Sequence, residues 1–171
     1  VHERCVIRHP SRGTFGPERV PFGTTGLASG GGGTMFERIV LAVDGSEPAR
    51  RAVPVAADIA SKYGAEVIAV HVLEQQLGRG GPIAFDTTEE ANRVADDTAR
   101  SLKDVGVSAR PEARAAIAGR AAQEIIDVAM SEDAGLIVMG SRGMSDWEGL
   151  LVGSVAHKVL HLSSVPVLIV R

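Results

Sequence analysis

The segment "RIVLAVDGSEPARRAVPVAADIASKYGAEVIAVHVLE", residues 38–74, decides the fold class. It holds two continuous apolar runs, over residues 38–44 and 65–74, that lack the polar alternation of a half-exposed strand. Such runs are typical of strands buried on both faces, as in a parallel sheet. We therefore predict two buried parallel strands, joined by residues 45–64.

Residues 45–64, between these strands, predict a helix. Ser46 can cap its N-terminus, Pro48 falls in the first turn, and Gly64 can provide the left-handed residue that ends a helix. Pro54 lies inside this segment, where it should bend the helix or mark a frayed turn. The whole segment then forms a strand–helix–strand unit.

The rest of the chain repeats this alternation. Pro111 removes a backbone donor, which places the third strand at an edge of the sheet. The order βαβαβαβαβ predicts an α/β fold: a five-stranded, doubly wound, Rossmann-like parallel sheet with right-handed crossovers and helices on both faces. The remaining elements are expected as a loop over 75–88, helices over 89–106, 119–134 and 153–163, and strands over 107–115, 135–140 and 165–171.

The first 34 residues differ in composition from the rest. They are rich in glycine, end in a four-glycine run and show no helical or strand period. Such a segment buries too little apolar surface to offset its chain entropy. We expect residues 1–34 to be either a disordered extension or wrongly assigned coding sequence before a start at Met35, and we favour the second. The folded domain is then 35–171.

Composition excludes several classes of function. The chain has 18 basic and 21 acidic residues, a formal net charge of −3 and 4% aromatic residues, which argues against nucleic-acid binding. No apolar run approaches the roughly 20 residues that span a bilayer. Cys5 is the single cysteine, which fits a reducing compartment, and we expect a cytoplasmic protein.

A glycine motif stands in "VMGSRGMSDWEGLLVGSV", residues 138–155, with the spacing Gly140-x2-Gly143-x9-Gly153-Ser154. It follows a buried strand and opens a helix, whose first amide groups attract phosphate. Gly153 allows close approach of the backbone, Ser154 adds a hydroxyl and Arg142 could screen phosphate charge. Glycines that merely form turns are the alternative.

Four segments together resemble the universal stress protein family: "IVLAVDGSEPA", "VIAVHV", "LIVMGSRG" and "GLLVGSVAHKVLHLSSVPVLIVR". The resemblance extends over residues 36–171, and the glycine spacing matches that family's ATP-binding motif. It implies the strand order 3-2-1-4-5, which brings Asp44 and the glycine loop to one crevice. Ligands of open parallel sheets bind at that position.

The resemblance implies ATP as the ligand, with Mg²⁺, and a role for each matching residue. The acidic Asp146, inside the nine-residue spacer, would oppose phosphate unless a divalent cation intervenes. The residues expected to bind nucleotide are Ala42, Asp44 and Val72 around adenine and ribose, Met139 and Gly140 at the ribose, and Gly143, Gly153, Ser154 and Val155 at the phosphates, with Arg142 beside them.

Three histidines are candidate functional groups. His71 lies inside an apolar strand, which favours a hydrogen-bonded core residue over a catalytic base. His157 and His161 lie one helical turn apart, a spacing that can bind zinc, but no third ligand is evident. We therefore expect neither a catalytic histidine nor a metal site.

The final strand, residues 165–171, would expose an apolar edge, and such an edge invites pairing with another chain. Two copies pairing through it would form an isologous homodimer, as the resemblance also implies.

The expected function is ATP binding by a regulatory stress-response module without efficient catalysis, its protein partner unknown. No G-x-x-x-x-G-K-[ST] phosphate loop is present. A slow ATPase or autophosphorylating enzyme on the same fold, and a nucleotide-free structural dimer, are the alternatives.

Overall fold

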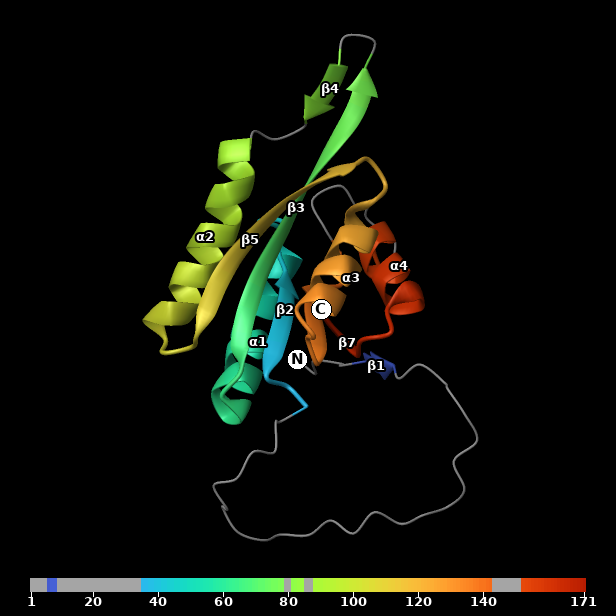
Figure 1. Ribbon diagram of the computed structural model, residues 1–171. Helices are drawn as coiled ribbons and strands as arrows, with labels where there is room; N and C mark the ends of the chain where they lie inside the picture. Colours follow the sequence, from blue (N-terminus) through green and yellow to red (C-terminus); the bar gives the residue numbers. More distant parts are fainter. Residues whose placement is uncertain (1–5, 9–34, 79–80, 85–87, 143–151) are drawn as a thin grey trace, which may run out of the picture.

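The computed structural model describes residues 6–8, 35–78, 81–84, 88–142 and 152–171 of the chain. Its centre is a parallel sheet in which the five predicted strands have the order β5-β3-β2-β6-β7 (Figure 1). In chain order this is 3-2-1-4-5, so the predicted α/β fold and strand order are confirmed. These strands are β2 (Arg38–Ala42), β3 (Glu66–Gly78), β5 (Ala109–Ile117), β6 (Leu136–Gly140) and β7 (Val167–Val170).

Two helices cover each face of the sheet (Figure 1). On one face α1 and α2 bury alanines and Leu102 against odd-numbered residues of β2 and β3, such as Leu41. On the other face α3 and α4 bury residues such as Ile125 and Val159 against even-numbered ones, such as Val40. The helices are α1 (Glu47–Tyr63), α2 (Thr88–Asp104), α3 (Ala121–Ser131) and α4 (Ser154–Leu162). Among the described residues no helix is long and apolar enough to cross a membrane.

Helix α1 begins and ends as its sequence predicts. The Ala49 amide donates to Ser46 Oγ (3.3 Å), which makes Ser46 the N-cap. Gly64 has a positive φ of 67° and ends the helix, and its amide donates to the Ala60 carbonyl. The helix continues through Pro54, whose missing amide costs it one internal hydrogen bond.

The predicted loop over 75–88 is wrong in part, because most of it forms a hairpin. Strand β3 continues to Gly78 and pairs antiparallel with β4 (Gly81–Ala84), with Gln75 opposite Ala84. Figure 1 shows this hairpin projecting past the ends of the helices. Gly78 lies opposite Gly81, and the sequence has Gly80 between them; glycine in a two-residue connection is a usual signal of a tight hairpin.

Residues 6–8 also depart from expectation. They form a short strand, β1 (Val6–Arg8), which pairs antiparallel with β7 and places Val6 opposite Ile169. Residues 1–5, with Cys5, and residues 9–34 lie outside the described part of the chain. The edge of β7 is therefore covered by the chain's own N-terminal segment in this structure.

The opposite edge of the sheet is β5, as Pro111 predicts; within the described residues it pairs only with β3. Charged side chains occupy it: Arg110 contacts Glu132 (2.6 Å) and Glu112 (3.2 Å). The bond from Arg110 lowers the pKa of Glu132 and raises that of Arg110. Charges of this kind discourage pairing with a second sheet.

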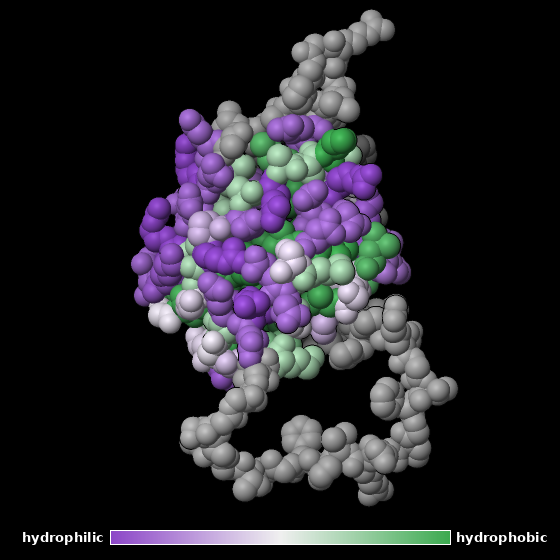
Figure 2. All heavy atoms as spheres, in the orientation of Figure 1, coloured by the Kyte–Doolittle hydropathy of each residue, from purple (hydrophilic) through white to green (hydrophobic). Residues whose placement is uncertain are grey.

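On the face that Figure 2 shows, apolar side chains are scattered among hydrophilic ones.

Gly140 ends β6 where helix α1 begins above it. A Cβ atom built on Gly140 would lie 2.6 Å from the Pro48 carbonyl carbon, 2.7 Å from its oxygen and 2.8 Å from the Ala49 nitrogen. All three contacts are with helix backbone, which cannot yield as a flexible side chain would. Any other residue here must push α1 away from β6.

We expect Gly140→Ala to lower the free energy of unfolding by about 1–3 kcal/mol, the usual cost of overpacking. Urea unfolding measures this change. Gly106→Asn is the control for replacing a glycine away from α1: a Cβ there has no neighbour within 4 Å, and asparagine adopts a positive φ with less strain than most residues, so its cost is backbone strain and not contact with a helix. Equal stability of Gly140→Ala and wild type would show that α1 does not need this close approach.

Candidate functional site

Strands β2 and β6 lie side by side at the point where the strand order reverses. They run parallel, with Ala42 opposite Met139. The chain leaves β2 toward α1 on one face, and it leaves β6 toward α4 on the other. The carboxyl ends of strands at such a reversal are where open α/β sheets bind ligands.

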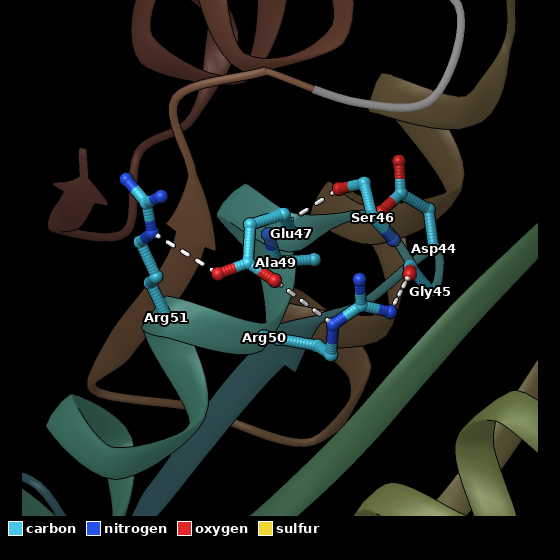
Figure 3. A network of polar contacts seen from close by, with 7 residues as sticks. All are labelled: Asp44, Gly45, Ser46, Glu47, Ala49, Arg50 and Arg51. Carbon is cyan, nitrogen blue, oxygen red and sulfur yellow. Dashed lines mark hydrogen bonds and ion pairs between the residues drawn. The ribbon is translucent and has the colours of Figure 1, made fainter.

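The turn between β2 and α1 is held by its own side chains (Figure 3). Gly45 has a φ of +78°, a conformation that favours glycine. Asp44 is half-buried, and its Oδ1 accepts the Ser46 amide (3.0 Å). Asp44 therefore shapes the start of α1, as well as standing at the tip of β2.

Two arginines reinforce this helix start (Figure 3). Arg50 donates to Glu47 (3.2 Å) and to the Gly45 carbonyl (2.5 Å), and Arg51 donates to Glu47 (3.4 Å). These hydrogen bonds, first from Arg50 and then from Arg51, lower the pKa of Glu47. All three side chains are exposed, so their ion pairs add little to stability.

The start of α4 is tied to the tip of β6 by Ser141. The Ser141 amide donates to the Val170 carbonyl (2.7 Å), and the Ser141 carbonyl accepts the Gly153 amide (2.7 Å). This residue joins the ends of β6 and β7 to the first residue before α4. The N-terminus of α4, where amides lack intrahelical acceptors, is thus fixed at the carboxyl end of β6.

The structure brings together the apolar residues of the predicted site. Ala42 and Met139 are buried in one cluster on the face of α3 and α4, and Val72 and Val155 pack against it while partly exposed. Arg142, which follows the end of β6, and Ser154, the first residue of α4, are exposed. Gly153 is buried. Gly143, Asp146 and the rest of 143–151 lie outside the described residues.

Two predicted glycines have specific structural tasks. The missing side chain of Gly140 faces the backbone of α1, so helix–strand packing alone explains a glycine there. Gly153 has an ordinary φ of −70° and uses its amide on Ser141, so any phosphate contact would come from the amides after it.

Sequence reasoning missed three groups at this end of the sheet. Ser141 was not distinguished from its neighbours. Glu74 caps α3, because its Oε1 accepts the amides of Gly119 (2.9 Å) and Ala121 (3.1 Å). Lys158 of α4 donates to the Gly119 carbonyl (3.1 Å). The predicted strand 65–74 ends at Glu74, but this carboxylate can be identified as a cap only when the topology shows that α3 begins beside it.

The structure gives His71 the buried, hydrogen-bonded position that its sequence predicts. His71 is 5% exposed and bonded through Nδ1 to the Val43 carbonyl, as expected of a core residue. The rings of His157 and His161 lie 4.4 Å apart on α4. Within the described residues no three histidine, cysteine or acidic side chains are grouped to hold a metal ion.

An open groove lies away from this site, between α1 and α2. Its walls are mostly apolar, and it lies on the other face of the sheet from the cluster of Ala42 and Met139. The polar side chains of Asp58, Ser61 and Ser101 also line it, and none of the predicted site residues is among its lining residues. Its lining includes Val53, Pro54, Ala57, Asp58, Ser61, Ser101, Leu102 and Val105.

Comparison with known proteins decides the family. The family model described as "Universal stress protein family" matches residues 35–171. The chain belongs to the universal stress protein family. A universal stress protein of Thermus aquaticus is 36% identical over 139 residues, which cover 80% of this chain and all of the relative.

Solved structures of the family have the same fold. The protein MJ0577 of Methanocaldococcus jannaschii superposes with a TM-score of 0.66 at 27% identity, covering 80% of this chain and 96% of its own. A universal stress protein of Archaeoglobus fulgidus in complex with dAMP gives 0.59 at 27%, covering 81% and 100%. A universal stress protein in complex with cAMP has a TM-score of 0.58 at 26% identity, covering 80% of this chain and 97% of its own.

Proposed function

We propose that this universal stress protein binds ATP, together with Mg²⁺, at the carboxyl ends of β2 and β6, and that the bound nucleotide regulates a partner protein in the cytoplasm. The complexes of related proteins with dAMP and cAMP support an adenine nucleotide as the ligand. The glycine spacing from Gly140 to Ser154, which resembles the ATP-binding motif of the family, supports ATP as that nucleotide.

One observation carries the proposal: Ser141 fixes the N-terminus of α4 at the tip of β6. A helix N-terminus carries a partial positive charge, which stabilises an anion in front of it. The exposed hydroxyl of Ser154 and the exposed guanidinium of Arg142 stand at this end. Because both groups are already exposed, phosphates could bind them without a rearrangement of the core.

The remaining groups fit the rest of a nucleotide. Val72 and Val155 offer partly exposed apolar surface beside the buried Ala42 and Met139, which suits a flat base and a ribose. Asp44 presents a half-buried carboxylate at the tip of β2, suited to a base or ribose donor. Magnesium would be held chiefly by the phosphates themselves, as it commonly is in nucleotide sites.

The same groups argue against efficient hydrolysis. Ser46 Oγ accepts the Ala49 amide and caps α1, which gives this hydroxyl a structural role, and Asp44 is placed at the base and ribose and not at the phosphates. We therefore propose that the nucleotide is retained as a signal and that its slow turnover, if measured, lies far below that of a dedicated ATPase.

A carboxylate placed at the start of α4 tests the phosphate position. We expect Ser154→Glu to weaken ATP binding about tenfold or more, because the new charge repels phosphate. The same charge favours the helix N-terminus, so the free energy of unfolding should not fall. Isothermal titration with Mg-ATP and urea unfolding measure the two quantities.

Ser154→Gln is the control, since it adds the same bulk and loses the same hydroxyl without adding charge, and it should bind ATP clearly more tightly than Ser154→Glu does. Adenosine, which has no phosphate, should bind Ser154→Glu and Ser154→Gln alike. If Ser154→Glu kept the wild-type affinity for ATP, the phosphates would lie elsewhere.

We also propose a homodimer that pairs through residues 165–171. In this structure β1 occupies the free edge of β7, so a second copy must displace residues 6–8 to pair there. The edge is otherwise a row of unpaired backbone groups, which favours either occupant.

Sedimentation at micromolar concentration tests this assembly. We expect the chain beginning at Met35 to be dimeric and the full chain to associate more weakly, because β1 competes for the edge. A monomer in both cases would contradict the dimer. Equal association of the two would show that β1 does not compete.

A further inference from the structure

His71 is a buried titratable residue in the middle of β3, directly after the position where the pairing of β3 with β2 ends. It follows Val67 and Ala69 on the face of β3 that packs against α1 and α2, since side chains alternate along a strand. It is 5% exposed, and its Nδ1 lies 2.8 Å from the carbonyl oxygen of Val43. This bond links β3 to the residue just before Asp44.

Val43 is where the chain leaves the sheet. The register of β2 with β3 ends at Ala42 opposite Val70, and the Val43 amide still donates to the Val70 carbonyl (2.9 Å). The Val43 carbonyl is then bonded by the side chain of His71. That carbonyl belongs to the peptide group between Val43 and Asp44, so His71 fixes the orientation of the Asp44 backbone.

The hydrogen bond also determines which nitrogen of the ring carries the proton. A carbonyl oxygen can only accept, so Nδ1 must donate, and the neutral ring is the Nδ1–H tautomer. The next turn residue, Gly45, stands near α2, since a Cβ on it would lie 3.8 Å from Val94 Cγ2.

We propose that His71 is a positioning residue of the nucleotide site, which acts by holding the peptide group between Val43 and Asp44. The inference rests on the proposed function, in which Asp44 contacts the base or ribose. Asp44 stands at the end of β2, and a rotation of that peptide group would move its carboxylate. A binding group is useful only when the residues behind it fix its position.

The test compares two substitutions that differ in one hydrogen bond. Asparagine places an amide near the position of Nδ1, so His71→Asn can still donate to the Val43 carbonyl, whereas His71→Leu cannot. We expect His71→Leu to weaken Mg-ATP binding about tenfold, the effect of one hydrogen bond, and His71→Asn to restore most of it. Isothermal titration of the full-length protein gives both affinities.

Val67→Ala is the matched control. Val67 is fully buried, lies on the same strand and face as His71, and stands four residues before it in the sequence. It should lower the free energy of unfolding without changing the affinity for ATP. If Val67→Ala weakened binding as much as His71→Leu, or if His71→Asn failed to restore it, the loss would reflect general destabilisation and the proposal would be wrong.

Nitrogen NMR of the ligand-free wild type provides a second measurement that needs no bound nucleotide. The Nδ1–H tautomer of His71 is expected, and the Nε2–H tautomer would overturn the proposal even if His71→Leu failed to fold. The amide signals of Asp44 and Ser46 should shift in His71→Leu and return in His71→Asn. If the wild type bound no nucleotide, the proposed function would fail, while these signals would still decide whether His71 holds the turn.

Discussion

The close approach of α1 to β6 is the constraint on which the arrangement of this end of the molecule depends. Gly140 leaves no side chain between the strand and the backbone of Pro48 and Ala49. Helix α1 can therefore begin directly beside the tip of β6, although it is connected to β2. The start of α1, which follows β2, and the start of α4, which follows β6, therefore both lie at the carboxyl end of β6.

The polar groups at this place first complete the fold. Asp44 and Ser46 bond amides of the α1 turn, and Ser141 joins β6, β7 and α4. His71 and Glu74, both on β3, fix the turns that precede α1 and α3. A ligand binding here would meet groups whose positions are set before it arrives, which lowers the cost of ordering them.

Much of this could be predicted from local sequence. Uninterrupted apolar runs and helix caps at Ser46 and Gly64 located the α/β elements, because those signals act over a few residues. The strand β1 was missed because its partner, the edge of β7, exists only in the assembled fold. The hairpin of β3 and β4 was missed although its glycine signal is local in the sequence. Gly140 is predicted as a ligand residue, but its packing task could not be predicted locally, because a Cβ built there would meet the backbone of Pro48 and Ala49, which lie far earlier in the chain.

The central claim is that an adenine nucleotide with several phosphates occupies the junction of β2, β6 and α4. The most direct measurement is to purify the full chain under mild conditions, denature it, and identify the released small molecules by chromatography and mass. The account predicts ATP in near-stoichiometric amount, or saturable binding when Mg-ATP is added to protein that releases none. No released nucleotide and no binding of added Mg-ATP would contradict it, and the glycines of residues 140–153 would then serve only the packing of the fold.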